Sequence, residues 1–288
     1  MTLQIFPTQP GYVLTRDGTA LFCRDWRPDG QAKSPTFVFL TGWALSSEMW
    51  AYQMLPLVRD GYRCVAYDRR GHGRSSDPGR GFDYDTLAGD LADVLATLDL
   101  DDVVLVAHSM AGGEAVRYLN RHGHKGIRGL VLIAPAGMPF LVQTPDNPDG
   151  IPVEALAAEH AAVIADFPGW CDSKADAYFV PGTARTAIDW TLRTMSETSF
   201  RAVADLNHAV LMTDFRSELP RLDLPVLILH GDRDESAPLE LTGRRAAALI
   251  KGARLEVYQG APHGLYFTHQ ERINSDLRQF ADIVMEPA

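Results

Sequence analysis

The sequence has few cysteines, and their arrangement suits neither a disulfide framework nor a metal site. Cys23, Cys64 and Cys171 stand at unrelated spacings, without a C-x-x-C pair or the paired spacing of zinc ligands. We expect all three to have structural roles, and Cys64, which lies in an apolar run, to be a small core residue. The sequence predicts no metal and no cofactor.

The chain also lacks an excess of positive charge and a long hydrophobic run. Its 27 Lys and Arg residues are outnumbered by 37 Asp and Glu residues, which gives a formal net charge of −10 and argues against nucleic acid or an anionic membrane as a partner. No apolar stretch approaches the roughly 18 residues of a membrane span, and Met1 to Tyr12 shows no charged segment followed by an apolar core. We expect a soluble cytoplasmic protein, and a homo-oligomer is left open.

What the sequence does contain is an alternation of short apolar runs with amphipathic segments. The apolar runs predict strands at 20–26, 36–40, 62–67, 103–107, 130–134, 226–229 and 254–258. The amphipathic segments predict helices at about 46–59, 84–98, 110–121, 239–250 and 269–284. This rhythm indicates an α/β fold with a mostly parallel sheet, helices on both faces and an active site at the carboxyl ends of the strands.

The strand rhythm stops between residues 136 and 216, where prolines punctuate short helical pieces such as 153–166. Because the rhythm resumes afterwards, we interpret 136–216 as a helical lid inserted into one core domain formed by 1–135 and 217–288. Six aromatic side chains of this segment are candidates for lining an apolar pocket, although most are expected to pack the lid onto the core: Phe140, Phe167, Trp170, Tyr178, Phe179 and Trp190.

Ser109 is the candidate nucleophile, because it stands where a β-branched run ends and a helix begins. The surrounding pattern is close to the G-x-S-x-G nucleophile elbow, with Ala107 and Ala111 in place of the two glycines. Both alanines keep small side chains where strand and helix crowd together, but they lose glycine's free access to positive φ. The neighbouring His108 is expected to point away from the serine.

A serine nucleophile needs a base and a carboxylate that orients the base. His263 lies in a loop after the last predicted strand, which places it at the same sheet edge as Ser109. Asp232 and Asp234 both follow the strand at 226–229, and side-chain alternation cannot separate two residues that are two positions apart.

Two backbone amides are the candidate oxyanion donors. One belongs to Met110, directly after the nucleophile. The other belongs to Trp43, in the loop 41–43 that follows a predicted strand, where we expect Gly42 to let the backbone turn sharply. The Trp43 ring itself is expected to be a packing element.

With these positions, the chain resembles the α/β-hydrolase superfamily, and specifically the bacterial arylesterases and cofactor-free haloperoxidases, also called perhydrolases. The resemblance runs from Gly18 to about Phe280 and is carried by the motifs at 68–75, 109–110, 143–150, 213–215, 230–234 and 261–264. It implies an eight-stranded sheet, the catalytic order Ser, Asp, His along the chain, Asp234 as the triad acid, and the Trp43 and Met110 amides as oxyanion donors.

The chain departs from the family pattern in two places. Thr41-Gly42-Trp43 replaces the usual His-Gly-Trp, and Ala107-His108-Ser109-Met110-Ala111 replaces Gly-Phe-Ser-Met-Gly. Both departures bear on substrate preference more than on reaction type.

The resemblance implies a serine hydrolase that cleaves a small or medium carboxylic ester, such as an aryl ester or a lactone, through an acyl-enzyme. Hydrogen peroxide in place of water would give a perhydrolase side activity. Two alternatives are a carbon–carbon bond hydrolase or cofactor-free oxygenase on the same fold, and a non-catalytic ligand-binding protein. Oxygen-dependent turnover would indicate the oxygenase, and failure of a fluorophosphonate to label Ser109 would indicate the non-catalytic protein.

Overall fold

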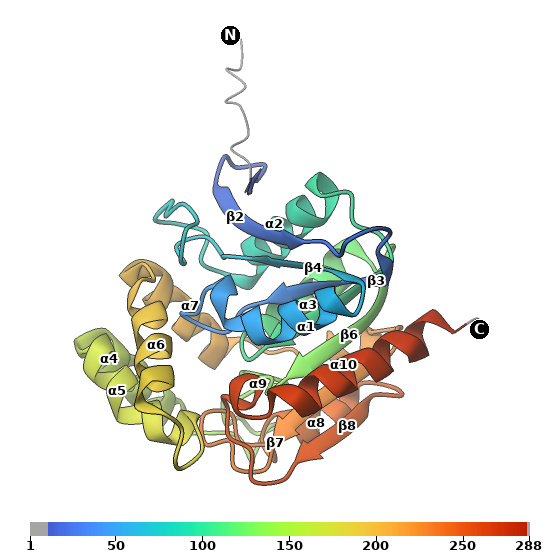
Figure 1. The fold of residues 1–288 in the computed structure, drawn as a ribbon. Coiled ribbons are helices and arrows are strands. Elements are labelled where there is room, and N and C mark those ends of the chain that lie inside the picture. The colour runs from blue at the N-terminus through green and yellow to red at the C-terminus, as the bar shows by residue number, and fades with distance from the viewer. Residues whose placement is uncertain (1–10, 287–288) are drawn as a thin grey trace.

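The apolar runs of the sequence form the strands of one eight-stranded sheet (Figure 1). The structure is a computed structural model that describes residues 11–286. The strands lie in the order β1-β2-β4-β3-β5-β6-β7-β8; β1 and β2 run antiparallel to their neighbours, and β3 to β8 are parallel. Their bounds are β1 Tyr12–Leu14, β2 Ala20–Trp26, β3 Lys33–Leu40, β4 Tyr62–Tyr67, β5 Val103–His108, β6 Ile127–Ile133, β7 Val226–Gly231 and β8 Arg254–Tyr258. The predicted fold class is confirmed, and β1 is an addition to the strands that the sequence predicted.

The strand register places the carboxyl ends of the central strands side by side. Leu40 at the end of β3 pairs with Ala107 of β5, and Ile133 at the end of β6 pairs with both His108 of β5 and Leu229 of β7. The loops that follow these strands therefore leave the sheet at one edge, which is where parallel α/β sheets form their sites.

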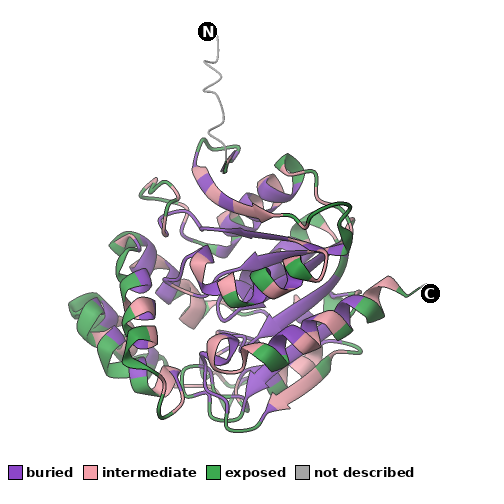
Figure 2. Ribbon diagram, in the orientation of Figure 1, coloured by how far each residue is buried: buried purple, intermediate pink, exposed green. Residues whose placement is uncertain are grey.

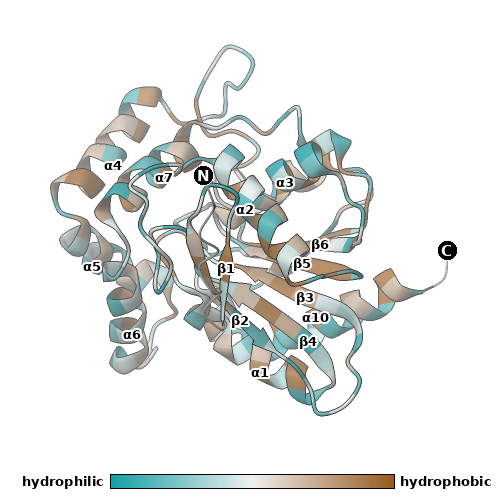
Figure 3. Ribbon diagram, turned by 90° about the horizontal axis from the view of Figure 1, so that it is seen from above, coloured by the Kyte–Doolittle hydropathy of each residue, from teal (hydrophilic) through white to brown (hydrophobic). Residues whose placement is uncertain are grey.

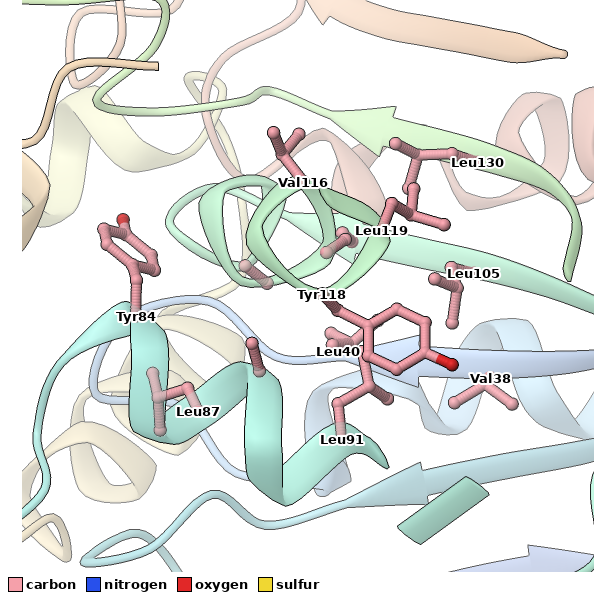
Figure 4. Packing of buried hydrophobic residues seen from close by; sticks show 14 of the residues in the cluster. Val38, Leu40, Tyr84, Leu87, Leu91, Leu105, Val116, Tyr118, Leu119 and Leu130 are labelled. Carbon is pink, nitrogen blue, oxygen red and sulfur yellow. The ribbon is translucent and has the colours of Figure 1, made fainter. Parts of the chain in front are cut away.

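Helices cover both faces of the sheet. One face is covered by α2 (Tyr84–Thr97), α3 (Ala111–His122) and α8 (Gly243–Leu249), and the other by α1 (Ala51–Arg59) and α10 (Gln270–Met285). Alternate side chains of a strand supply the two cores: Val38 and Leu105 pack under α2 and α3 (Figure 4), whereas Phe39 belongs to the α1 and α10 side. The strands β4, β5, β6 and β7 are accordingly buried along most of their length, whereas β1, β2 and β8 are only partly buried (Figure 2). Hydrophobic residues predominate in the central strands (Figure 3).

The helix boundaries lie close to those predicted. A 3-10 turn, η1 (Ser47–Trp50), precedes α1, and a four-residue helix, α9 (Leu265–Thr268), precedes α10. The helix expected from Leu239 begins only at Gly243, because Thr242 before it has non-helical backbone angles (φ −124°, ψ −86°).

Four helices lie between β6 and β7: α4 (Val153–Ala165), α5 (Phe167–Tyr178), α6 (Arg185–Ser196) and α7 (Phe200–Met212). They gather to one side of the sheet, with the outward faces of α4, α5 and α6 largely exposed (Figures 1 and 2). A short 3-10 turn, η2 (Leu219–Arg221), leads back to β7.

All three cysteines are buried and unpaired. Burial raises the pKa of the Cys23 and Cys171 thiols to about 12, so both stay protonated and unreactive at neutral pH. The expected structural role of the cysteines fits these surroundings.

Candidate active site

Ser109 occupies the sharp turn between β5 and α3. Its φ of +57° lies in the left-handed region, which is uncommon for a residue other than glycine, and its amide donates to the Ile133 carbonyl of β6 at 2.9 Å. Ala107 and Ala111 are fully buried, and neither is among the described residues with positive φ. The serine itself therefore adopts the strained conformation, and the two flanking positions need only be small.

The structure brings Ser109, His263 and Asp234 together. His263 Nε2 lies 2.9 Å from the Ser109 hydroxyl, and His263 Nδ1 lies 2.7 Å from Asp234 Oδ2. With the carboxylate ionised, the Nδ1 proton is donated to Asp234, which leaves Nε2 unprotonated to accept the serine proton. All three residues are buried, with exposed fractions of 5 to 7%.

The two aspartates of the turn after β7 have different surroundings. Asp234 Oδ2 faces His263 and also His230 Nε2, 3.2 Å away, and its Oδ1 accepts two backbone amides. Burial alone would raise the pKa of Asp234, but His263 and His230 together hold it well below its usual range. Asp232 is exposed and accepts the Gly260 amide at 2.6 Å. The sequence motif left both open, and only Asp234 contacts the histidine.

His230, at the end of β7, is a site residue that was not among the candidates predicted from the sequence. Its Nε2 lies 2.8 Å from the Ala237 carbonyl, which can only accept, so the Nε2 proton is shared between that carbonyl and Asp234. The signal was present in the sequence, since His230 stands four positions before Asp234, at the end of the strand that leads into this turn.

His108, next to Ser109 in the sequence, contacts the loop that carries His263. Its Nε2 lies 3.1 Å from the His263 carbonyl, and the two rings pack at 4.9 Å. Burial, followed by the neighbouring His263, lowers the pKa of His108 to about 3, so the ring is neutral. A Cβ on Gly42 would lie 2.6 Å from His108 Nδ1. Gly42 is therefore required for the close approach of this ring. The backbone turns directly after Gly42, whose carbonyl accepts the Leu45 amide, and the positive φ of this turn lies at Ala44.

The two residues that carry the candidate oxyanion amides lie at the same cavity as Ser109. Trp43 and Met110 both line it, and neither amide donates a hydrogen bond to another residue of the described range. The Trp43 side chain is a packing element, as expected: its indole N–H donates to the Val203 carbonyl of α7 at 3.0 Å, and its ring packs edge-on against Phe167 of α5.

The cavity has a volume of about 270 Å³ and is lined by the residues around Ser109 and by residues of α4, α5, α6 and α7. Of the six candidate aromatic residues, Trp170, Tyr178 and Phe179 line it. Phe140, Phe167 and Trp190 pack instead against other side chains. The cavity is therefore mostly apolar, and Ser109 and His263 are among its polar lining residues.

The end of helix α5 contacts the loop that carries His263 through a hydrogen bond and ring packing. The Gly264 amide donates to the Tyr178 carbonyl at 2.9 Å, and the Tyr178 ring packs edge-on against His263 with a centroid separation of 5.4 Å. The helices between β6 and β7 therefore contact the loops on both sides of Ser109.

The fold and this arrangement define the class of protein. A protein family described as "alpha/beta hydrolase fold" matches residues 35–270, and the chain belongs to this family.

Individual relatives narrow the comparison. The chain is 39% identical to a non-heme chloroperoxidase of Kitasatospora aureofaciens over 92% of its length and 97% of the relative's. It is 37% identical to a bifunctional esterase/perhydrolase of Acinetobacter calcoaceticus, covering 94% and 99% of the two chains. Among solved structures, an esterase from Exiguobacterium antarcticum superposes with a TM-score of 0.88 at 28% identity, covering 95% of this chain and all of the other. The expected resemblance to haloperoxidases and perhydrolases is confirmed.

Residues 11–286 contain no cluster of three or more His, Cys, Asp or Glu side chains suited to a metal ion. None of the helices in that range has the length and hydropathy of a membrane span.

Proposed function

We propose that the protein is a carboxylic ester hydrolase that works through an acyl-enzyme on Ser109. The observation that carries the proposal is the position of His263, 2.9 Å from the Ser109 hydroxyl and 2.7 Å from Asp234, on the floor of an apolar cavity. The names of the relatives, which include an esterase and an esterase/perhydrolase, support the same reaction. The substrate is a small-molecule ester with an apolar acyl or aryl group.

The residues of the site have distinct roles in the proposed reaction. His263 Nε2 takes the proton of Ser109 as its Oγ attacks the ester carbonyl carbon, and the amides of Trp43 and Met110 donate to the oxyanion that forms. His263 then gives the proton to the leaving alcohol, and the acyl group remains on Ser109. Water, deprotonated by the same imidazole, releases the acid. Asp234 orients His263 and stabilises its protonated form throughout.

Perhydrolysis follows as a side activity when hydrogen peroxide attacks the acyl-enzyme in place of water. The product is then a peracid instead of the acid. Assaying the same ester with and without peroxide separates the two outcomes, because peracid oxidises a halide or dye that the ester and the acid leave unchanged.

The segment 136–216 acts as a lid in this proposal, on a core formed by 1–135 and 217–288. Three features support this role: the four helices lie between two sheet strands, each of them contributes to the cavity lining, and the Trp43 indole N–H is hydrogen-bonded to the Val203 carbonyl of α7. The lid would select the ester by the shape of the cavity.

Replacing Ser109 tests the proposed nucleophile. Ser109→Ala is expected to lower kcat for a chromogenic short-chain ester by about 10³-fold or more and to prevent labelling by a fluorophosphonate, with the circular dichroism spectrum unchanged. Full retention of activity would overturn the assignment. A wild-type protein that neither turns over esters nor reacts with the probe would overturn the enzymatic function and favour a ligand-binding protein.

A further inference from the structure

A buried ion pair lies directly behind the loop that carries the Trp43 amide. Arg69, in the loop after β4, and Glu114, on α3, have side-chain exposures of 1% and 0%, and Arg69 Nε donates to Glu114 Oε2 at 2.7 Å. The Tyr67 hydroxyl donates to the other carboxylate oxygen. Both carboxylate oxygens of Glu114 are therefore hydrogen-bonded. Because Arg69 contacts Glu114 through Nε, its two outer nitrogens, Nη1 and Nη2, can donate to other groups.

Those outer nitrogens bind the backbone of the oxyanion loop. Nη2 donates to the Thr41 carbonyl at 2.5 Å, and Nη1 donates to the Gly42 carbonyl at 3.3 Å. The Gly42 carbonyl also accepts the Leu45 amide at 3.3 Å. A guanidinium fork that meets two successive carbonyls fixes the direction of both peptide planes.

The Gly42 carbonyl and the Trp43 amide belong to the same peptide group. This peptide is not among the cis bonds of the described residues, so its C=O and N–H point in opposite directions. A carbonyl held towards the buried guanidinium therefore turns the Trp43 N–H away from it, towards the cavity that Trp43, Ser109 and Met110 line.

We propose that Arg69 is a positioning residue of the oxyanion hole, which orients and polarises the Gly42–Trp43 peptide so that its N–H is a stronger and better-aimed donor. Glu114 holds the guanidinium in place. Because Glu114 belongs to α3, the helix that follows Ser109 and Met110, the ion pair also ties the two oxyanion donors to each other. The inference rests on the proposed ester hydrolysis and on the oxyanion role given there to Trp43.

Elementary electrostatics supports this role. Hydrogen bonds in a chain polarise one another, and a charged donor on the carbonyl makes the amide hydrogen of the same peptide more positive. Donors that are oriented before the reaction need no reorganisation when the oxyanion forms. Stability alone explains the arrangement poorly, since apolar residues of similar volume often replace a buried ion pair without loss of stability.

Arg70 provides a matched control. Like Arg69 it is 1% exposed, and it forms two bonds to a buried carboxylate, that of Asp90, at 2.6 and 2.7 Å. Its remaining bonds go to Asp17 and to the Arg80 carbonyl, away from the loop at 41–43. Arg69→Lys and Arg70→Lys therefore remove equally buried guanidinium groups, and only the first touches the oxyanion loop.

The test compares catalysis with the binding of a transition-state analogue. Kinetic constants for p-nitrophenyl acetate and the inhibition constant of a phenylboronic acid, which forms a tetrahedral adduct on serine, are measured for both variants together with Tm. Arg69→Lys is expected to lower kcat by about 10- to 100-fold and to raise the inhibition constant of the boronic acid by a similar factor. KM is expected to stay within about 3-fold of wild type. Arg70→Lys is expected to leave all three within about 3-fold at a comparable loss of Tm.

The outcomes separate this inference from the proposed function. Equal changes in kcat and boronic acid affinity for the two variants, or unchanged values for Arg69→Lys, would overturn the role of Arg69 while ester hydrolysis stands. A wild-type protein without ester turnover would overturn both. If Arg69→Lys does not fold, Glu114→Gln replaces it, because the amide keeps an acceptor for Arg69 but removes the charge. A fall in kcat and boronic acid affinity at constant KM then supports the inference, and unchanged values overturn it.

Discussion

At the scale of single residues, the turn after β7 shows how two identical side chains acquire different chemistry. Asp234 is buried and hydrogen-bonded to two histidines and two backbone amides. Burial raises its pKa, but His263 and His230 outweigh burial and hold the pKa well below the usual range. Asp232 lies in solvent and bonds one loop amide. The first is suited to stabilising an imidazolium, and the second to holding the turn.

Exchanging each carboxylate for an amide separates these roles. Asp234→Asn is expected to lower kcat by about 10³- to 10⁴-fold, because the amide favours the wrong imidazole tautomer and no longer stabilises the protonated ring. Asp232→Asn keeps an oxygen acceptor for the Gly260 amide and should retain kcat within about 3-fold. Initial rates on one chromogenic ester give both values. The reverse order of effects would exchange the two assignments.

The sequence identified the serine and histidine of the site but left the acid undecided on residue pattern alone. Asp232 and Asp234 share a side of the chain, and the choice between them depends on where His263 arrives from a different loop. The contact of His108 with the His263 loop was not predicted for the same reason. Strand alternation gives the direction of the His108 side chain, but its partner, the His263 carbonyl, is 155 residues away in the sequence. Contacts of this kind arise only from tertiary packing.

At the scale of elements, long periodic segments were predicted well and short ones were not. The strands of the parallel sheet and helices such as α2 follow the expected ranges, because their burial pattern extends over several turns or residues. β1 has only three residues, of which one is buried, so no periodicity could reveal it. The sequence predicted short helical pieces within 136–216, and the piece at 153–166 corresponds to α4, but it did not place α5, α6 and α7 individually.

The contact between α5 and the His263 loop is the element-level feature that bears most on catalysis. Gly264 has an ordinary φ of −78°, but a Cβ there would lie 2.5 Å from the Tyr178 carbonyl oxygen and 2.9 Å from its ring. Gly264→Ala should therefore displace either the end of α5 or the loop, and we expect kcat to fall by about 10-fold or more, because small misplacements of a catalytic group are costly. Steady-state kinetics measures this loss.

Gly89 is the control for that substitution. It lies inside α2, and a Cβ there would meet nothing within 4 Å. Gly89→Ala should leave the kinetic constants unchanged and raise the free energy of unfolding by about 0.5 to 1 kcal/mol, since alanine loses less backbone entropy in a helix. Equal kinetics in the Gly264→Ala and Gly89→Ala proteins would show that the α5 contact does not position His263.

At the scale of the whole molecule, two buried histidines couple folding to pH. His72 and His108 are both fully buried, and each has its pKa lowered to about 3, by burial first and then by a neighbouring side chain, Arg69 for His72 and His263 for His108. The unfolded chain has a histidine pKa near 6.5. Between about pH 6.5 and 3 the unfolded state therefore binds more protons than the folded state, and acid favours unfolding.

Replacing His72 tests this coupling without touching the active site. Its Nδ1 bonds the Arg70 carbonyl at 2.9 Å, and the amide of His72→Gln offers a donor for the same carbonyl. The stability linked to His72 is fully present above about pH 6.5 and decreases by about 1.4 kcal/mol per unit as the pH falls towards 3. Urea unfolding at about pH 7.5 and about pH 5 should therefore show a loss of free energy of unfolding that is about 2 kcal/mol larger for wild type than for His72→Gln. Contributions from His108 and from the carboxylates are common to both proteins and cancel in the comparison. Parallel losses in the two proteins would show that His72 is protonated in the folded state and that burial does not control its titration.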